Sequence, residues 1–198
     1  VLVVGDLSDS DKSVIDEYNA TMTDYETLNQ YSELRAAYDK YYTLTFSEGI
    51  AVIGESAFYY RNYDRIDSPV KSISLPKSLV SVGKNAFFSL RSLTSLALPE
   101  GLYSVGIAAF QDAFKVPKEN EKTVELVLPK SLAFVGNLAF ACGFAEISDI
   151  TIPNPDMQIG EYALPSRIAE EFGKTTIHGY AKSTAAQYAA GQSDTSQH

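Results

Sequence analysis

The chain has 198 residues, 45% of them hydrophobic and 21% charged, which is the size and composition of one globular domain or one short repeat array. Its formal net charge of −9 excludes the basic surface that nucleic acids and anionic membranes attract. The single cysteine excludes an internal disulfide and a cysteine-based metal cage, and two histidines offer little for catalysis.

Residues 1–42 differ in composition from the rest of the chain. They hold nine acidic and three basic residues and six of the thirteen tyrosines. Tyrosine and leucine recur at helical intervals after a capping box at Thr23–Glu26, which predicts a helix from about Asp24 to Lys40. A shorter helix over Asp11–Asn19 and a strand over Val1–Asp6 complete a predicted N-terminal cap, which would cover the hydrophobic end of the repeats that follow.

The same segment carries an acidic run from Asp6 to Glu17. Clustered carboxylates are the ligands that calcium prefers. Counted from Asp9, however, the run has no glycine at the sixth position of a calcium loop and no glutamate at the twelfth. We therefore interpret it as a solvated, helix-capping acidic surface and predict no metal site.

From residue 43 onward one motif is written five times: an apolar-x-apolar pair, then a proline in four of the five copies, then a glycine followed by alanine and an aromatic residue. The motif glycines are Gly54, Gly83, Gly106, Gly136 and Gly160. Three positions later stand Ala57, Ala86, Ala109, Ala139 and Ala163. The next position holds Phe58, Phe87, Phe110, Phe140 and, as a departure, Leu164.

Each repeated residue type has a physical role. The apolar pairs have the period of two that marks a half-buried strand, and proline ends the strand because it has no N–H group. We expect the motif glycine to supply a positive φ at a tight corner. Phenylalanines at the same place in successive coils predict an aromatic ladder through the interior, since each unit is too small to bury its own apolar face.

The repeats ISLPKSLVSVGKNAF, LALPEGLYSVGIAAF and LVLPKSLAFVGNLAF resemble those of the BspA-like leucine-rich repeat family. The resemblance covers residues 43–190 and departs from the commoner leucine-rich repeat, which carries Asn or Cys where proline stands here. It implies an α/β repeat solenoid: a right-handed coil stack with one parallel sheet of short strands, the N-terminal helical cap and a short C-terminal helix.

Two coils carry insertions. Successive motif glycines are 29, 23, 30 and 24 residues apart, so about 23 residues make the basic coil. The second insertion, 114–123, is rich in Lys and Glu and is interpreted as a solvated bulge. The first spans 59–70 and holds the residue types enriched at protein interfaces. Its candidate partner-binding residues are Tyr59, Tyr60, Arg61, Tyr63 and Arg65. In the alternative interpretation, both adjacent tyrosines pack on the coil and the last arginine pairs with a neighbouring aspartate.

The C-terminal end of the array is predicted to close with a strand over Thr175–His178 and a short helix capped by Ser183, followed by a flexible tail, 191–198. His178 and the terminal His198 stand in no catalytic motif, and Cys142 falls where the family repeat places a buried cysteine. No catalytic residue, cofactor site or enzyme activity is predicted.

These features favour a noncatalytic, adhesion-type module that binds a protein or glycan at a host or cell surface, as the resemblance implies for bacterial cell-surface members. The alternative is a structural spacer of a larger surface protein. The expected location is extracellular, with the export signal removed before Val1. No nucleic-acid or membrane partner is expected, and the expected oligomeric state is a monomer.

Overall fold

The computed structural model describes residues 42–60, 68, 70–115, 123–142, 147–165 and 175–193. Apart from Tyr42, the predicted N-terminal cap lies outside the described residues. The strands are β1 (Tyr42–Thr45), β2 (Val52–Ile53), β3 (Val70–Ser74), β4 (Ser81–Val82), β5 (Ser104–Val105), β6 (Val124–Val127), β7 (Phe134–Val135), β8 (Ile147–Thr151), β9 (Gln158–Ile159) and β10 (Thr176–His178). They are followed by the helix α3 (Thr184–Ser193).

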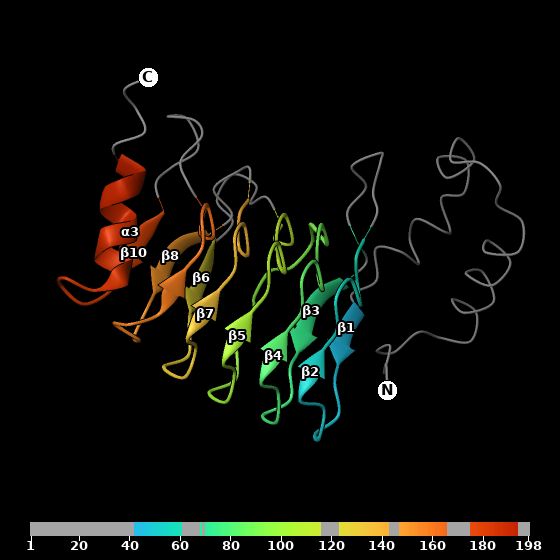
Figure 1. Cartoon of the computed structure of the whole chain (residues 1–198). Helices are drawn as coiled ribbons and strands as arrows, with labels where there is room; N and C mark the ends of the chain where they lie inside the picture. Colours follow the sequence, from blue (N-terminus) through green and yellow to red (C-terminus); the bar gives the residue numbers. More distant parts are fainter. Residues whose placement is uncertain are drawn as a thin grey trace, which may run out of the picture.

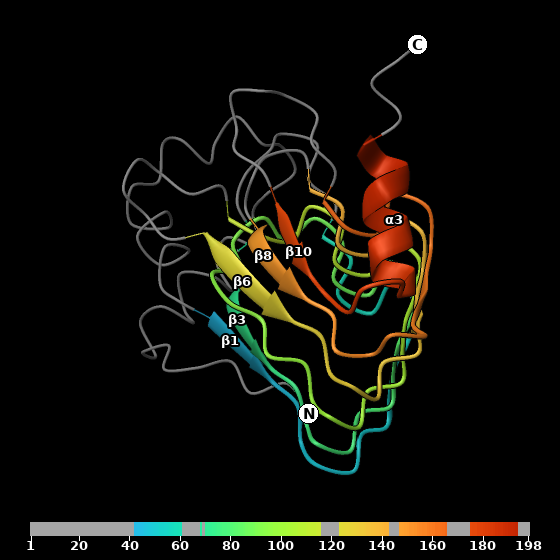
Figure 2. The same ribbon diagram turned by 90° about the vertical axis from the view of Figure 1, so that its left-hand side faces the viewer.

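The strands form two walls of a stacked coil (Figures 1 and 2). One wall holds the longer strands, as a β1-β3 pair and a three-stranded sheet in the order β10-β8-β6. The other wall is a five-stranded sheet in the order β2-β4-β5-β7-β9. All pairings are parallel, so the chain is a parallel β-solenoid.

Two details differ from the expected α/β solenoid with one sheet. The described coils connect their strands by turns, and α3 is the only helix that the described ranges contain. A second sheet forms because the residues just before each motif glycine are extended and pair with the coil above and below. The chain turns just before this second strand, as the hydrogen bond from the Leu79 N–H to the Pro76 carbonyl shows for the coil of Gly83.

The interior is filled as the repeat predicts. The rings of Phe58, Phe87, Phe110 and Phe140 stack in sequence, with centroids 5.1 to 5.5 Å apart and interplanar angles of at most 16°. The last three rings are completely buried. The predicted aromatic ladder is therefore confirmed, and it joins four successive coils through one continuous core.

The prediction that the motif glycines adopt a positive φ is wrong. Among the described residues, Gly49 is the glycine with a positive φ, and it is not one of the motif glycines. Instead, a Cβ atom on Gly106 would lie 2.6 Å from the backbone N of Lys84 and 2.7 Å from the carbonyl carbon of Gly83. The motif glycines after the first are thus required because the backbones of neighbouring coils approach too closely for a side chain.

The left-handed conformation falls two residues after each motif glycine. It is adopted by Ser56, Asn85, Ala108, Leu138 and Tyr162, with φ between 52° and 60°. An L-residue with a Cβ atom is disfavoured there by about 1 kcal/mol relative to glycine. The corner of each of these five coils therefore holds a strained residue that is not glycine.

Replacing Tyr162 with glycine is expected to raise the free energy of unfolding by about 0.5 to 1 kcal/mol, because the side chain is 52% exposed and the strain is removed. Urea unfolding followed by circular dichroism measures the change. Tyr180→Gly is the control, since Tyr180 is 60% exposed and does not have a positive φ. An equal gain in both variants would contradict the strain argument.

The helix α3 lies at the C-terminal end of the array, against β9 and β10 (Figure 2). Ser183 Oγ accepts a hydrogen bond from the Ala186 N–H, which confirms the predicted cap. Ala185 is buried, and the Tyr188 hydroxyl lies 3.2 Å from the Leu164 backbone N, where the phenylalanine ladder ends. Burial raises the pKa of Tyr188. The helix runs to Ser193, so it includes the first residues of the predicted tail.

Candidate functional site

Of the five candidate residues in the first insertion, the structure describes two. The Tyr59 ring stacks on Phe88, with centroids 4.9 Å apart and 6° between the planes, and 42% of Tyr59 stays exposed. Tyr60 is half-buried against the core. Both tyrosines therefore pack on the coil, as the alternative interpretation expected. Arg61, Tyr63 and Arg65 lie outside the described residues.

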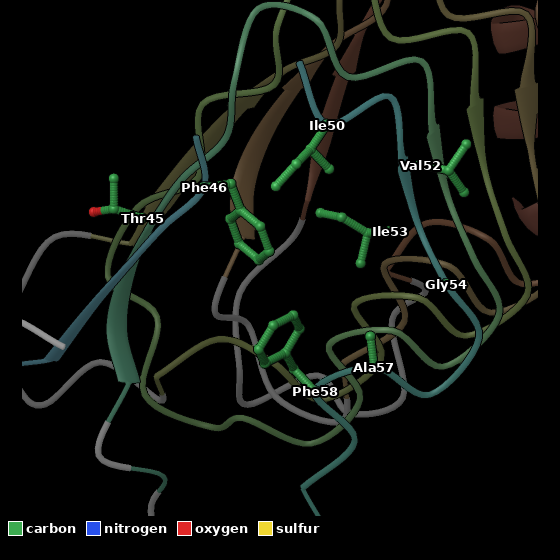
Figure 3. Close-up of a pocket in the computed structure, with 8 residues that line it drawn as sticks. All are labelled: Thr45, Phe46, Ile50, Val52, Ile53, Gly54, Ala57 and Phe58. Atoms are coloured by element: carbon green, nitrogen blue, oxygen red, sulfur yellow. The ribbon is translucent and has the colours of Figure 1, made fainter. Parts of the chain in front are cut away.

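Exposed apolar side chains gather elsewhere, on the outer face of the five-stranded sheet. Tyr103 is 50% exposed and Val80 is 46% exposed. The two residues are neighbours on successive coils, where the Tyr103 N–H donates a hydrogen bond to the Val80 carbonyl. The ring of Phe134 contacts that of Tyr103 edge to face, with centroids 5.3 Å apart. Val52, on the first coil, is 63% exposed and points outward (Figure 3). We call Val52, Val80, Tyr103 and Phe134 the apolar stripe.

The stripe crosses four successive coils without an overlying element. Its strands β2, β4, β5 and β7 lie side by side at the front of Figure 1, and no described element covers them. Between its apolar members the sheet presents Ser81 and Ser104, whose hydroxyls lie 2.9 Å apart in one hydrogen bond. Exposed apolar side chains that gather on one face of a sheet are typical of a protein-binding surface.

Charged residues of alternating sign line one side of the stripe. They stand six positions before the motif glycine in each of the first four coils, and all are exposed. In coil order they are Glu48, Lys77, Glu100 and Lys130. The Glu48 carboxylate also accepts hydrogen bonds from the Lys77 and Ser78 N–H groups, and the first of these lowers the pKa of Glu48. We call these four residues the charge column.

The wall of longer strands carries a shallow polar hollow of about 300 Å³, lined by Glu125, Val127, Asp149, Thr151 and His178 among others. His178 Nε2 lies 3.0 Å from Asp149 Oδ1, and this hydrogen bond lowers the pKa of the Asp149 carboxyl. The two side chains are about half exposed. The pair is thus a surface interaction between neighbouring strands β8 and β10.

An apolar hollow of about 230 Å³ opens at the N-terminal end of the described coils. Phe46, Ile50, Ile53 and Phe58 point into it from inside the first coil (Figure 3). On this side, the equivalent residues of each later coil are covered by the preceding coil, so among the described residues this hollow is the open end of the solenoid interior. The predicted cap over this end concerns residues outside the described part of the chain.

The described residues supply little catalytic chemistry. Cys142 is buried at 7% exposure, as its place in the repeat predicts. Within the described ranges, no three His, Cys, Asp or Glu side chains come together in a group that could hold a metal ion. In the same part of the chain, no helix combines the length and apolar character needed to cross a bilayer.

Comparison with known protein families decides the classification. The BspA type leucine-rich repeat region matches residues 67–165 in six copies. The chain belongs to the BspA type leucine-rich repeat family. Its described coils show the physical content of that repeat: two strand positions, a close-packed glycine and a buried alanine-phenylalanine pair.

Two solved structures are similar to this BspA type protein. One is a leucine-rich cell surface protein from Faecalibacterium prausnitzii A2-165, with 15% identity and a TM-score of 0.35 over 60% of this chain and 41% of that one. The other is the Treponema pallidum leucine-rich repeat protein, with 16% identity and a TM-score of 0.40 over 71% of this chain and 78% of that one. The chain thus spans less than half of the first. No curated protein matches it.

The apolar stripe was not predicted from the sequence, although a signal for it was present. Once the motifs are aligned on their glycines, the positions two and three residues before glycine are the outward ones. Val52 and Phe134 occupy the first of these positions, and Val80 and Tyr103 the second. Apolar residues at these solvent-facing positions of the repeat were the signal, whereas the residue types of the first insertion favoured that loop as the interface.

Proposed function

We propose that this BspA type leucine-rich repeat protein is a noncatalytic, adhesion-type module that binds a macromolecular partner at an extracellular or cell surface. The observation that carries the proposal is the apolar stripe on the five-stranded sheet. The family to which the chain belongs supports an interaction role, because stacked repeats provide extended binding surfaces rather than enclosed active sites.

The stripe supports binding for an energetic reason. Apolar area removed from water stabilises a complex by roughly 25 cal/mol per Å², and aromatic side chains contribute much of that area at small entropic cost. Tyr103 and Phe134 are already in contact in the free protein, so little side-chain freedom is lost when a partner covers them. A spacer with no partner would gain nothing from four apolar side chains held in water.

Binding to a panel of extracellular matrix proteins and glycans at physiological salt tests the proposal. The stripe variant Val80→Ser, Tyr103→Ser, Phe134→Ser is expected to lose saturable binding by at least about tenfold. The matched control changes Val127, Tyr162 and Tyr180 to serine. These residues are also exposed, by 62%, 52% and 60%, but lie outside the stripe. The control is expected to bind like the unmodified protein.

A second variant, with Tyr59, Tyr60, Arg61, Tyr63 and Arg65 changed to serine, tests the first insertion as the binding site. Loss of binding in this variant alone would place the site on the insertion and contradict the role of the stripe. Absence of binding to the whole panel would favour the spacer, which is the other function considered for this chain.

A further inference from the structure

We propose that the apolar stripe binds the same stripe of a second copy of this chain, related by a two-fold axis parallel to the strands. This inference goes beyond the proposed function, because it names a second copy of the chain as a partner of the same surface. The inference is based on the order of charges and side-chain types from coil to coil. When two copies face each other with opposite coil order, each charge meets an opposite charge and each apolar side chain of the stripe meets another.

The geometry of such a pairing is simple. Strands of the sheet lie at right angles to the axis along which the coils stack. A two-fold axis parallel to the strands turns one copy over onto the other, so each column of residues faces the same column in reverse coil order. The first coil then faces the fourth coil of the partner subunit, and the second faces the third. The interface is isologous and closed, which is the commonest symmetry among homo-oligomers.

Reversal matches every charge in the charge column with its opposite. The column reads Glu, Lys, Glu, Lys from the first coil to the fourth. In reverse it reads Lys, Glu, Lys, Glu. Glu48 therefore faces Lys130 of the partner subunit, and Lys77 faces Glu100 of the partner subunit. Symmetry repeats both pairs, so four opposite-charge pairs border the interface.

Three of the four charges make no ion pair within the described part of the chain, whereas the carboxylate of Glu48 already accepts two backbone hydrogen bonds. Within the described residues, Lys77, Glu100 and Lys130 form no salt bridge, and all three are exposed. Lys84, on the other side of the stripe, is paired with Glu55 at 3.3 Å. One side of the stripe thus has its charges paired within the chain, and the other has charges that a second copy can pair.

The same reversal matches the stripe itself. The column two residues before the motif glycine holds Val52, Ser81, Ser104 and Phe134, in register across β2, β4, β5 and β7. Val52 then faces Phe134 of the partner subunit, and the two serines face each other. In the preceding column Val80 faces Tyr103 of the partner subunit. Apolar groups meet apolar groups, and hydroxyl groups meet hydroxyl groups that can hydrogen-bond.

The other two-fold arrangement of facing sheets is unfavourable. An axis parallel to the stack keeps the coil order and brings the charge column opposite the column that follows each glycine. Glu48 would then face Glu55 of the partner subunit, and Lys77 would face Lys84 of the partner subunit. Like charges across an interface suppress that arrangement. The charge pattern therefore selects one orientation as well as the partner.

Sedimentation velocity of the unmodified protein, Lys77→Glu and Glu100→Lys, each alone and mixed in equal amounts, tests the inference. The unmodified chain is expected to form a dimer at micromolar concentration. Each single variant places like charges at two symmetric positions and is expected to raise the dissociation constant at least about tenfold. The equimolar mixture restores opposite charges only between different chains, so it is expected to form the dimer again.

Three results would overturn the inference: a monomer at all concentrations of the unmodified chain up to about ten times the expected range, single variants that dimerise like the unmodified chain, or a mixture that stays monomeric. If either variant fails to fold by circular dichroism, Glu48→Lys and Lys130→Glu provide the same design at the outer coils. The swapped double variant Lys77→Glu, Glu100→Lys restores complementarity in one chain and is expected to dimerise.

The two proposals fail in different ways. A chain that stays monomeric but loses matrix or glycan binding in the stripe variant would overturn the dimer and leave the adhesion role of the stripe intact. A chain that dimerises through the stripe and binds nothing on the panel would support the dimer and overturn the adhesion role.

Discussion

Replacing Phe110 with alanine is expected to lower the free energy of unfolding by about 3 to 5 kcal/mol. The ring is completely buried and stacks between Phe87 at 5.1 Å and Phe140 at 5.4 Å, so its removal leaves a cavity in the middle of the ladder. Because each coil is stabilised by its neighbours, the loss is expected to weaken both halves of the array. Urea or guanidinium unfolding followed by circular dichroism measures it.

Phe58→Ala is the matched control for this prediction. Phe58 belongs to the same ladder but lies at its first position, half-buried beside the open hollow, with Phe87 as its single stacked neighbour among the described residues. Its loss is expected to cost clearly less, about 1 to 2 kcal/mol, because the site is partly solvated already. Equal losses at the two positions would show that stacking between coils does not set the stability of the interior.

Replacing Gly106 with alanine is expected to lower the free energy of unfolding by about 3 kcal/mol or more, although only one methyl group is added. The new Cβ atom would lie 2.6 Å from the backbone N of Lys84, and a backbone cannot rotate away as a side chain can. The neighbouring coils must separate, which stretches the hydrogen bond from the Gly106 N–H to the Val82 carbonyl, now 2.8 Å. Thermal unfolding by calorimetry measures this loss.

Gly54→Ala separates close approach from every other role of the motif glycine. Gly54 has the same place in the first coil, but a Cβ atom there would meet nothing within 4 Å. The substitution is expected to be neutral or to stabilise by up to about 1 kcal/mol, because alanine restricts the unfolded chain. A large loss at Gly54 would contradict the explanation based on backbone approach.

Much of the fold could be predicted because the same residue types recur at the same offsets in successive copies of the repeat. Four phenylalanines at one offset from glycine predicted the ladder, and buried alanines at 86, 109, 139 and 163 follow from the same alignment. The conformation of the glycines was not predictable in this way. A missing Cβ atom is needed both for a positive φ and for close backbone contact, and the sequence cannot distinguish the two. The left-handed residue lies two positions later, at side chains such as Leu138 and Tyr162 that give no such signal.

The candidate site was less predictable than the fold. Residue types at Tyr59 and Tyr60 suit an interface, but the same tyrosines can equally pack on their own coil, and only coordinates show that Tyr59 stacks on Phe88. The stripe depends on which positions of each coil face outward. That information follows from the second sheet. Its strands, such as β4, are two residues long, which is too short to give a recognisable hydropathy pattern.

The hydrogen bonds that join neighbouring coils run along the stacking axis. The N–H groups of Gly83, Gly106, Gly136 and Gly160 each donate to the coil before, at 2.8 Å in every case. A force that pulls the two ends of the array apart would load these bonds end-on and open them one coil at a time. Each step would release the 23 residues of a basic coil, or up to about 80 Å of extended chain. Mechanically, the array would behave as an extensible tether that yields in increments and limits the tension it transmits, whatever it holds at its far end.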